Sequence, residues 1–94
     1  MKPSASVKLQ FSPLIKKQIK KLKKQPKIYS KLLLQLELFQ KTYNHPKLKT
    51  HRLTGSLKHV YAFSITYQLR VIFKWKNDQT VILLSLGSHD QIYR

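Results

Sequence analysis

Residues 69–94 read LRVIFKWKNDQTVILLSLGSHDQIYR, and this last third of the chain decides the fold. In residues 69–75, Leu, Val, Phe and Trp alternate with Arg, Ile and Lys. A period of two predicts a strand with one face in a core. Arg70 is then expected on the opposite, more open face.

The next segment predicts a second strand and a tail. Asn77 and Asp78 are typical of a turn, and the apolar run of residues 80–86 predicts a central strand that is covered on both sides. We expect Gly87 to end this strand and to free the backbone that carries the residues after it.

The first half of the chain predicts one strand and two helices. Val7, Leu9 and Phe11 alternate with polar residues, which predicts a short strand. Ser12 and Pro13 are typical of a helix start, and Pro26 is expected to end that helix. A second helix is predicted from about Lys27 to Tyr43. Leu34 and Leu38 fall outside its apolar stripe, so they are expected to be exposed.

Residues 47–58 form a long basic connection, which favours a functional loop. In residues 60–66, Tyr61, Phe63 and Ile65 share one face of a predicted strand, and Ala62, Ser64 and Thr66 share the other. That small, polar face could floor a cleft. The predicted order is strand, helix, helix and three strands, an α+β fold with two helices packed on a four-stranded sheet.

The composition limits the classes of protein. Ninety-four residues predict one domain, residues 1–94. The formal net charge of +16, from 19 Lys and Arg against three Asp and Glu, predicts a polyanionic or acidic partner, with nucleic acid first. The longest aliphatic run, residues 81–84, is too short to span a membrane, and residues 1–6 lack an apolar signal core, so we expect a cytoplasmic protein.

Several chemistries do not fit the residues. There is no Cys, and the four His and three acids are not spaced for a zinc or magnesium site, so we expect no metal and no cofactor. Neither a serine-hydrolase motif nor a glycine-rich phosphate loop is present. Cleavage of RNA by its own 2′-OH remains, since it needs only an acid, a base and cations. His51, Arg70, His89 and Tyr93 are the candidate groups.

Each candidate also has a structural explanation. A histidine in a basic loop is more often solvated than catalytic, and His45 and His59 are interpreted in that way. Arg70 could pair with Asp90 or cap a sheet edge. Tyr93 could fill the core or stack on a base.

Four motifs carry a resemblance to a known family. They are HRLTGSLK (51–58), YAFSI (61–65), LRVIF (69–73) and LGSHDQIY (86–93). Together they resemble the RelE/ParE superfamily of bacterial type II toxin-antitoxin toxins, and most of all its RelE/StbE and YafQ-like mRNA interferases. The resemblance covers residues 45–94 well, while residues before them agree only in their strand-helix-helix order.

The resemblance implies a RelE-like fold and a ribosome-dependent endoribonuclease that cuts mRNA without a metal. It implies that His51 and His89 transfer protons, that Arg70 stabilises the scissile phosphate, and that Tyr93 assists catalysis or stacks on the substrate. Where YafQ-like toxins have a further histidine and an aspartate, this chain has Ser64 and Gln68. The expected RNA contacts are basic residues of the loop, the strands and the tail: Lys47, Lys49, Arg52, Lys58, Lys74 and Arg94.

Two other functions stay open from the sequence: a ParE-like inhibitor of DNA gyrase that does not cut, and a simple nucleic-acid-binding domain. The ParE branch generally lacks the histidine set, so His51 and His89 argue against the inhibitor. The resemblance also implies an antitoxin that silences the chain in a toxin-antitoxin hetero-oligomer. An acidic amphipathic helix would suit exposed leucines beside dense positive charge.

Overall fold

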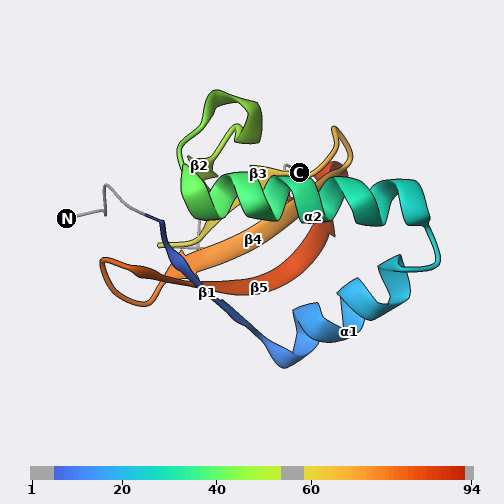
Figure 1. Cartoon of the computed structure of the whole chain (residues 1–94), viewed down its shortest axis with the longest axis horizontal. Helices are drawn as coiled ribbons and strands as arrows, with labels where there is room; N and C mark the ends of the chain where they lie inside the picture. Colours follow the sequence, from blue (N-terminus) through green and yellow to red (C-terminus); the bar gives the residue numbers. More distant parts are fainter. Residues whose placement is uncertain (1–5, 54–58, 93–94) are drawn as a thin grey trace.

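The computed structural model of the chain describes residues 6–53 and 59–92. In chain order its elements are β1 (Lys8–Phe11), α1 (Pro13–Leu22), α2 (Pro26–Lys41), the 3₁₀ turn η1 (Pro46–Leu48), β2 (His51–Arg52), β3 (Tyr61–Ser64), β4 (Leu69–Trp75), β5 (Thr80–Ser88) and α3 (His89–Ile92). The predicted α+β class is confirmed: α2 crosses in front of the sheet and α1 lies beside β5 (Figure 1). None of the helices in these two ranges is long and apolar enough to cross a membrane.

The sheet has five strands in the order β1-β5-β4-β3-β2, so the predicted count of four is wrong. The additional strand, β2, has only two residues, and a run that short carries no recognisable alternation. The last three strands, β3, β4 and β5, form an antiparallel meander, whereas β1 pairs parallel with β5. The first strand of the chain therefore lies next to the last one.

The start of α1 follows its capping residues. The Ser12 hydroxyl accepts a hydrogen bond from the Ile15 amide at 3.0 Å, and Pro13 occupies the first turn, as predicted. Ser12 also donates its hydroxyl to the Leu84 carbonyl at 2.6 Å, which fixes the helix start against β5. The helix ends at Leu22, before the predicted stop, and Pro26 begins α2.

Two helix glutamines complete the hydrogen bonding of the sheet where strand pairing stops. Beyond the end of β1, the Gln18 side chain accepts from the Leu86 amide at 2.7 Å and donates to the Leu86 carbonyl at 3.2 Å. Beyond the end of β2, the Gln35 amide group donates to the Ser64 carbonyl at 3.0 Å. Each glutamine thus supplies bonds that a neighbouring strand would otherwise make.

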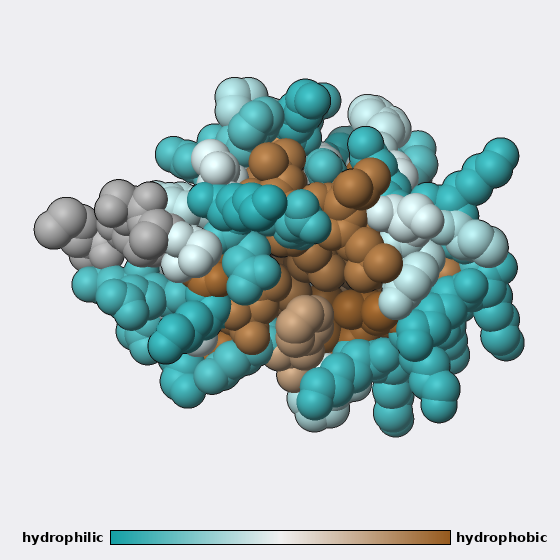
Figure 2. Space-filling view, in the orientation of Figure 1, coloured by the Kyte–Doolittle hydropathy of each residue, from teal (hydrophilic) through white to brown (hydrophobic). Residues whose placement is uncertain are grey.

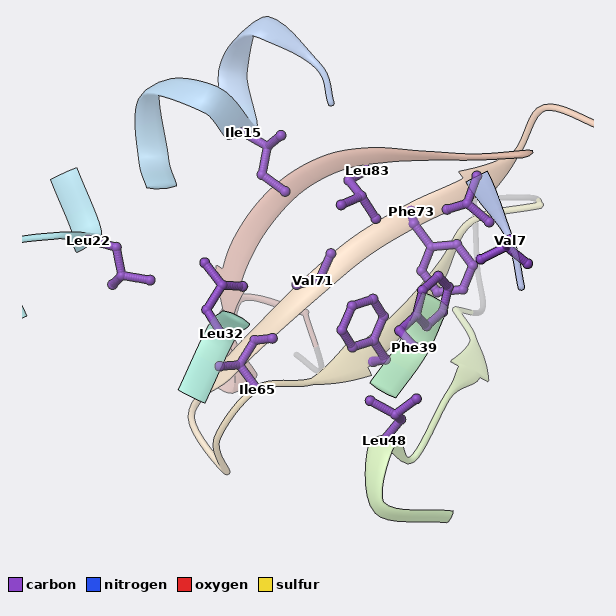
Figure 3. Close-up of a cluster of buried hydrophobic side chains, with 12 residues drawn as sticks. Val7, Ile15, Leu22, Leu32, Phe39, Leu48, Ile65, Val71, Phe73 and Leu83 are labelled. Carbon is purple, nitrogen blue, oxygen red and sulfur yellow. The ribbon is translucent and has the colours of Figure 1, made fainter. Parts of the chain in front are cut away.

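The core lies between the helices and one face of the sheet, where side chains from α1, α2, η1 and the strands converge (Figure 3). Phe39 of α2 stacks on Phe63 of β3 with ring centroids 4.4 Å apart, and meets Phe73 of β4 edge-on at 5.0 Å. Val71 and Phe73 are fully buried, which confirms the face predicted from the alternation in β4.

Three predictions about individual residues are corrected. Leu38, which was expected to be exposed, is half-buried against the core, whereas the exposure predicted for Leu34 is confirmed at 63%. Leu33 is also exposed, by 48%. Strand β5 runs through Gly87 to Ser88, so Gly87 does not end it. Ile82 and Leu84 in the same strand are only half-buried, so β5 is not covered fully on both sides.

Candidate functional site

The register of three strands sets Arg70 between two small residues. Arg70 of β4 lies opposite Ser64 of β3 on one side and opposite Gly87 of β5 on the other. Since neighbours across a ladder share a face of the sheet, these three residues lie on the face opposite the Phe63 and Val71 core positions. A glycine beside Arg70 leaves room for a long side chain.

Arg70 is buried, with 5% of its surface exposed, so the prediction that it projects from an open face is wrong. The alternation predicted the correct face of the sheet, but it could not show that other residues cover Arg70 on that face. One guanidinium nitrogen, Nη2, donates to the Tyr67 carbonyl at 2.9 Å. The guanidinium carbon lies 5.9 Å from the Tyr67 ring centroid, within cation–π range. Arg70 therefore fixes the turn between β3 and β4.

The same turn holds His89. The Tyr67 phenol ring stacks on the His89 imidazole, with centroids 5.0 Å apart and planes inclined by 18°. The His89 amide donates to the Gln68 carbonyl at 2.7 Å. His89 begins α3 directly after β5. The side chains of Arg70, Tyr67 and His89 form one cluster, which we call the arginine–tyrosine–histidine cluster.

Tyr67 is a site residue that the sequence patterns did not single out, because it lies between two predicted strands and belongs to none of the four motifs. It is 68% exposed although it is a large aromatic residue. An aromatic ring in a tight turn, three residues before an arginine, is the signal that could have identified it. Asp90, by contrast, has 92% of its side chain exposed and its Oδ1 lies 3.7 Å from His89 Nδ1, too far for a hydrogen bond.

His51 stands at the start of β2, on the outer strand of the sheet. Its Nδ1 lies 2.8 Å from the Lys49 carbonyl oxygen. A carbonyl can only accept, so Nδ1 is the donor and the neutral imidazole carries its lone pair on Nε2. This tautomer suits a group that takes up a proton.

The structure does not bring His51 and His89 into contact. His51 pairs with Ala62, which puts it on the same face as Ser64 and Arg70. Strands β3 and β4 separate it from β5, and three strand spacings amount to about 14 Å. Arg70 lies on a strand between the two histidines. The pairing of these two histidines in catalysis therefore stays a prediction.

The structure describes four of the six predicted RNA-binding residues. Lys47 and Lys49 are exposed and line a pocket of about 380 Å³ at the outer side of β3. Arg52 and Lys74 are exposed on β2 and β4. Three predicted site residues lie outside the described residues, namely Lys58, Tyr93 and Arg94.

The positions that depart from YafQ-like toxins also lie at this site. Ser64 faces the pocket, as the prediction of a small, polar cleft floor implies, and Gln68 is exposed with its carbonyl bound to the His89 amide. Within residues 6–53 and 59–92, His, Asp and Glu side chains form no cluster of three or more that could hold a metal ion.

Three solved structures of bacterial proteins share this architecture. The YafQ toxin in the Escherichia coli DinJ-YafQ toxin-antitoxin complex has a TM-score of 0.74 and 21% identity, covering 95% of this chain and 99% of its own. A YoeB/ParE toxin from Agrobacterium tumefaciens has a TM-score of 0.74 at 14% identity, and the match covers 88% of this chain and 99% of that toxin. The YoeB dimer from Staphylococcus aureus has a TM-score of 0.71 at 20% identity, covering 90% and 99%. No curated protein sequence matches the chain.

These likenesses define the fold as that of the RelE/YoeB-like toxins. The family described as "Bacterial toxin of type II toxin-antitoxin system, YafQ" matches residues 7–94, almost the whole chain. The chain therefore belongs to the YafQ family of type II toxins, and the resemblance found in the sequence motifs is confirmed.

Proposed function

We propose that the chain is a ribosome-dependent endoribonuclease that cleaves mRNA without a metal, by attack of a ribose 2′-OH on the adjacent phosphate. The arginine–tyrosine–histidine cluster carries this proposal. It holds a cation and an imidazole, linked through Tyr67, on a strongly basic chain. Such a reaction needs a proton acceptor, a proton donor and positive charge at the phosphorane, and it needs no covalent intermediate with the protein.

Each group has a proposed role. Arg70 balances the negative charge that develops on the phosphate oxygens, and its hydrogen bond to Tyr67 holds it in place. His89 donates a proton to the departing 5′-oxygen. His51, with its lone pair on Nε2, accepts the proton of the 2′-OH. Tyr93 stacks on the substrate or assists catalysis, as the family resemblance implies.

The proposed contacts to RNA follow the basic residues. Lys47, Lys49, Arg52, Lys58, Lys74 and Arg94 bind phosphates of the mRNA, with the ribosome presenting the strand in the cytoplasm. Phosphate contacts position a strand and carry no sequence information. Because each phosphate contact releases counterions, RNA binding is expected to weaken steeply as the salt concentration rises.

The direct experiment compares the wild type with a His51→Ala/His89→Ala double variant in a translating extract that contains a chelator. The wild type is expected to cleave mRNA and the double variant is not. Equal cleavage by both, or none by the wild type, contradicts the proposal. A gyrase supercoiling assay on the same samples distinguishes the ParE-like alternative, which predicts inhibition without cutting.

We also propose an acidic antitoxin as the partner that silences the chain. Figure 2 shows apolar side chains exposed between α1 and α2, surrounded by hydrophilic ones. The exposed large apolar residues of the two helices are Leu14, Leu33 and Leu34. An acidic amphipathic helix would cover such leucines and offset part of the charge of +16. The solved complex of YafQ with DinJ supports a hetero-oligomer of this kind.

A further inference from the structure

A pocket opens at the outer edge of β3, just past the end of β2. Strand β2 pairs only with Tyr61 and Ala62, so the edge of β3 is not covered by a strand at Ser64. At this point α2 lies against β3, and the Gln35 side-chain amide donates a hydrogen bond to the Ser64 carbonyl at 3.0 Å. The pocket measures about 380 Å³, which is within the size of small-molecule sites.

The lining of this pocket is cationic. Lys31 comes from α2, Lys47 and Lys49 come from the segment around η1, and Arg70 comes from β4. No acid is among the lining residues within the described part of the chain. Of the three acids in the sequence, Glu37 is bound to Lys41 at 3.3 Å. Because four cations from three segments face one space, an anion there would be attracted from several sides.

A buried hydroxyl in the lining indicates a ligand with hydrogen-bonding oxygens. Ser64 is 7% exposed, and its Oγ has no hydrogen-bond partner among the residues that the structure describes. A buried polar atom without a partner is costly, so such atoms in native proteins call for an explanation. A phosphate oxygen that enters the pocket can accept this hydroxyl's hydrogen bond while the lysines neutralise its charge.

We propose that this pocket binds the phosphate group of a nucleotide, with Ser64 as hydrogen-bond donor and Lys31, Lys47 and Lys49 as the charged contacts. The pocket shares Arg70 with the arginine–tyrosine–histidine cluster. Resting on the proposed function, the ligand is an mRNA nucleotide beside the cleaved one, held by its phosphate. Lys31 brings α2 into substrate binding, a role that the sequence did not assign to this helix.

The first experiment measures binding without any cleavage. Inorganic phosphate is titrated into the ¹⁵N-labelled full chain, and amide shifts of Ser64, Thr66 and Tyr67 are followed by NMR. We expect saturable shifts that are confined to the pocket. Lys31→Ala and Ser64→Ala are each expected to weaken binding about tenfold, the size of a charge-assisted hydrogen bond. Lys20→Ala removes the same charge from an exposed position of α1, outside the pocket, and is expected to bind as the wild type does.

The second experiment identifies the source of the phosphate. A short all-2′-deoxy oligonucleotide cannot undergo 2′-OH attack, so its binding reports recognition alone. Lys31→Ala is expected to lower the slope of log K against log salt concentration by about 0.7, the value for one phosphate contact on a single strand. If inorganic phosphate binds saturably but Lys31→Ala does not change this slope, the pocket binds only free phosphate compounds. That result would overturn the proposal that the pocket binds an mRNA phosphate.

The outcomes separate this proposal from the nuclease. Non-saturable shifts spread over the lysines, or equal losses in Lys20→Ala and Lys31→Ala, would overturn the pocket even if the wild type cleaves mRNA. Saturable binding in a chain that never cleaves would leave the pocket in place and remove the nuclease.

Discussion

The imidazole of His89 stacks on the ring of Tyr67 at 5.0 Å, and this contact joins the end of β5 to the turn before β4. The Tyr67 carbonyl is in turn held by the guanidinium of Arg70. Tyr67 thus connects Arg70 and His89, two of the groups that we propose for the chemistry.

We therefore predict that Tyr67→Ala slows mRNA cleavage while Tyr67→Phe does not. Aromatic stacking contributes about 0.5–1.5 kcal/mol, so loss of the ring should lower the rate about two- to tenfold through misplacement of His89. Single-turnover cleavage at saturating ribosome concentration measures this effect. The Phe variant is the control, because it keeps the ring and loses only the hydroxyl. An unchanged rate in the Ala variant would show that the stack does not position His89.

The bonds of Gln18 to Leu86 give a prediction about stability. Gln18→Ala removes the partners of one amide and one carbonyl at the edge of β5, and it should lower the free energy of unfolding by about 1–3 kcal/mol. Gln40→Ala makes the same substitution at an exposed position of α2 and should change the stability by less than about 0.5 kcal/mol. Urea denaturation of both variants measures the difference. Equal effects of the two substitutions contradict the edge-capping role.

Ser64→Ala is predicted to have the opposite effect on stability. The hydroxyl oxygen is buried without a partner in the described part of the chain, so its removal should leave the free energy of unfolding unchanged or raise it by about 1 kcal/mol. Thermal unfolding in phosphate-free buffer provides the measurement. A marked loss of stability would mean that the hydroxyl has a structural partner, and it would weaken the case for a ligand.

The exposed leucines of α2 give a prediction about the partner. Leu33→Gln/Leu34→Gln should leave the fold intact, since both side chains are largely exposed, but it should weaken binding of the acidic antitoxin that we propose as the partner about tenfold or more. Calorimetric titration with the purified antitoxin measures the affinity. Lys31→Gln, also on α2, serves as a control for loss of charge. Undiminished affinity in the double-leucine variant would place the antitoxin elsewhere.

The sequence predicted the elements with strong periodicity and missed features that depend on what lies beside them. The alternation in β4 correctly placed Val71 and Phe73 in the core. It could not reveal that Arg70 is buried, because a period of two identifies the face on which a residue lies and not what packs against that face. A glycine after an apolar run predicts a strand end, yet Gly87 continues β5 opposite Arg70.

Long-range pairing was the other limit. No local pattern showed that β1 would pair parallel with β5, or that His51 would start a two-residue strand. The candidate residues came from motifs, whereas Tyr67 and Lys31 became visible only when the fold brought them to Arg70.

The most direct test of the account uses ribosomes programmed with mRNA, with the upstream fragment analysed for a 2′,3′-cyclic phosphate end, the product of 2′-OH attack. The wild type should produce this end, and a 2′-deoxy substitution at the cleaved nucleotide should prevent it. His89→Ala should be at least about a hundredfold slower, as expected for loss of a general acid. His59→Asn is the control, because His59 is exposed and Asn tolerates its positive φ of 63°. Cleavage by His89→Ala at the wild-type rate, or an upstream fragment without the cyclic phosphate, would contradict the account.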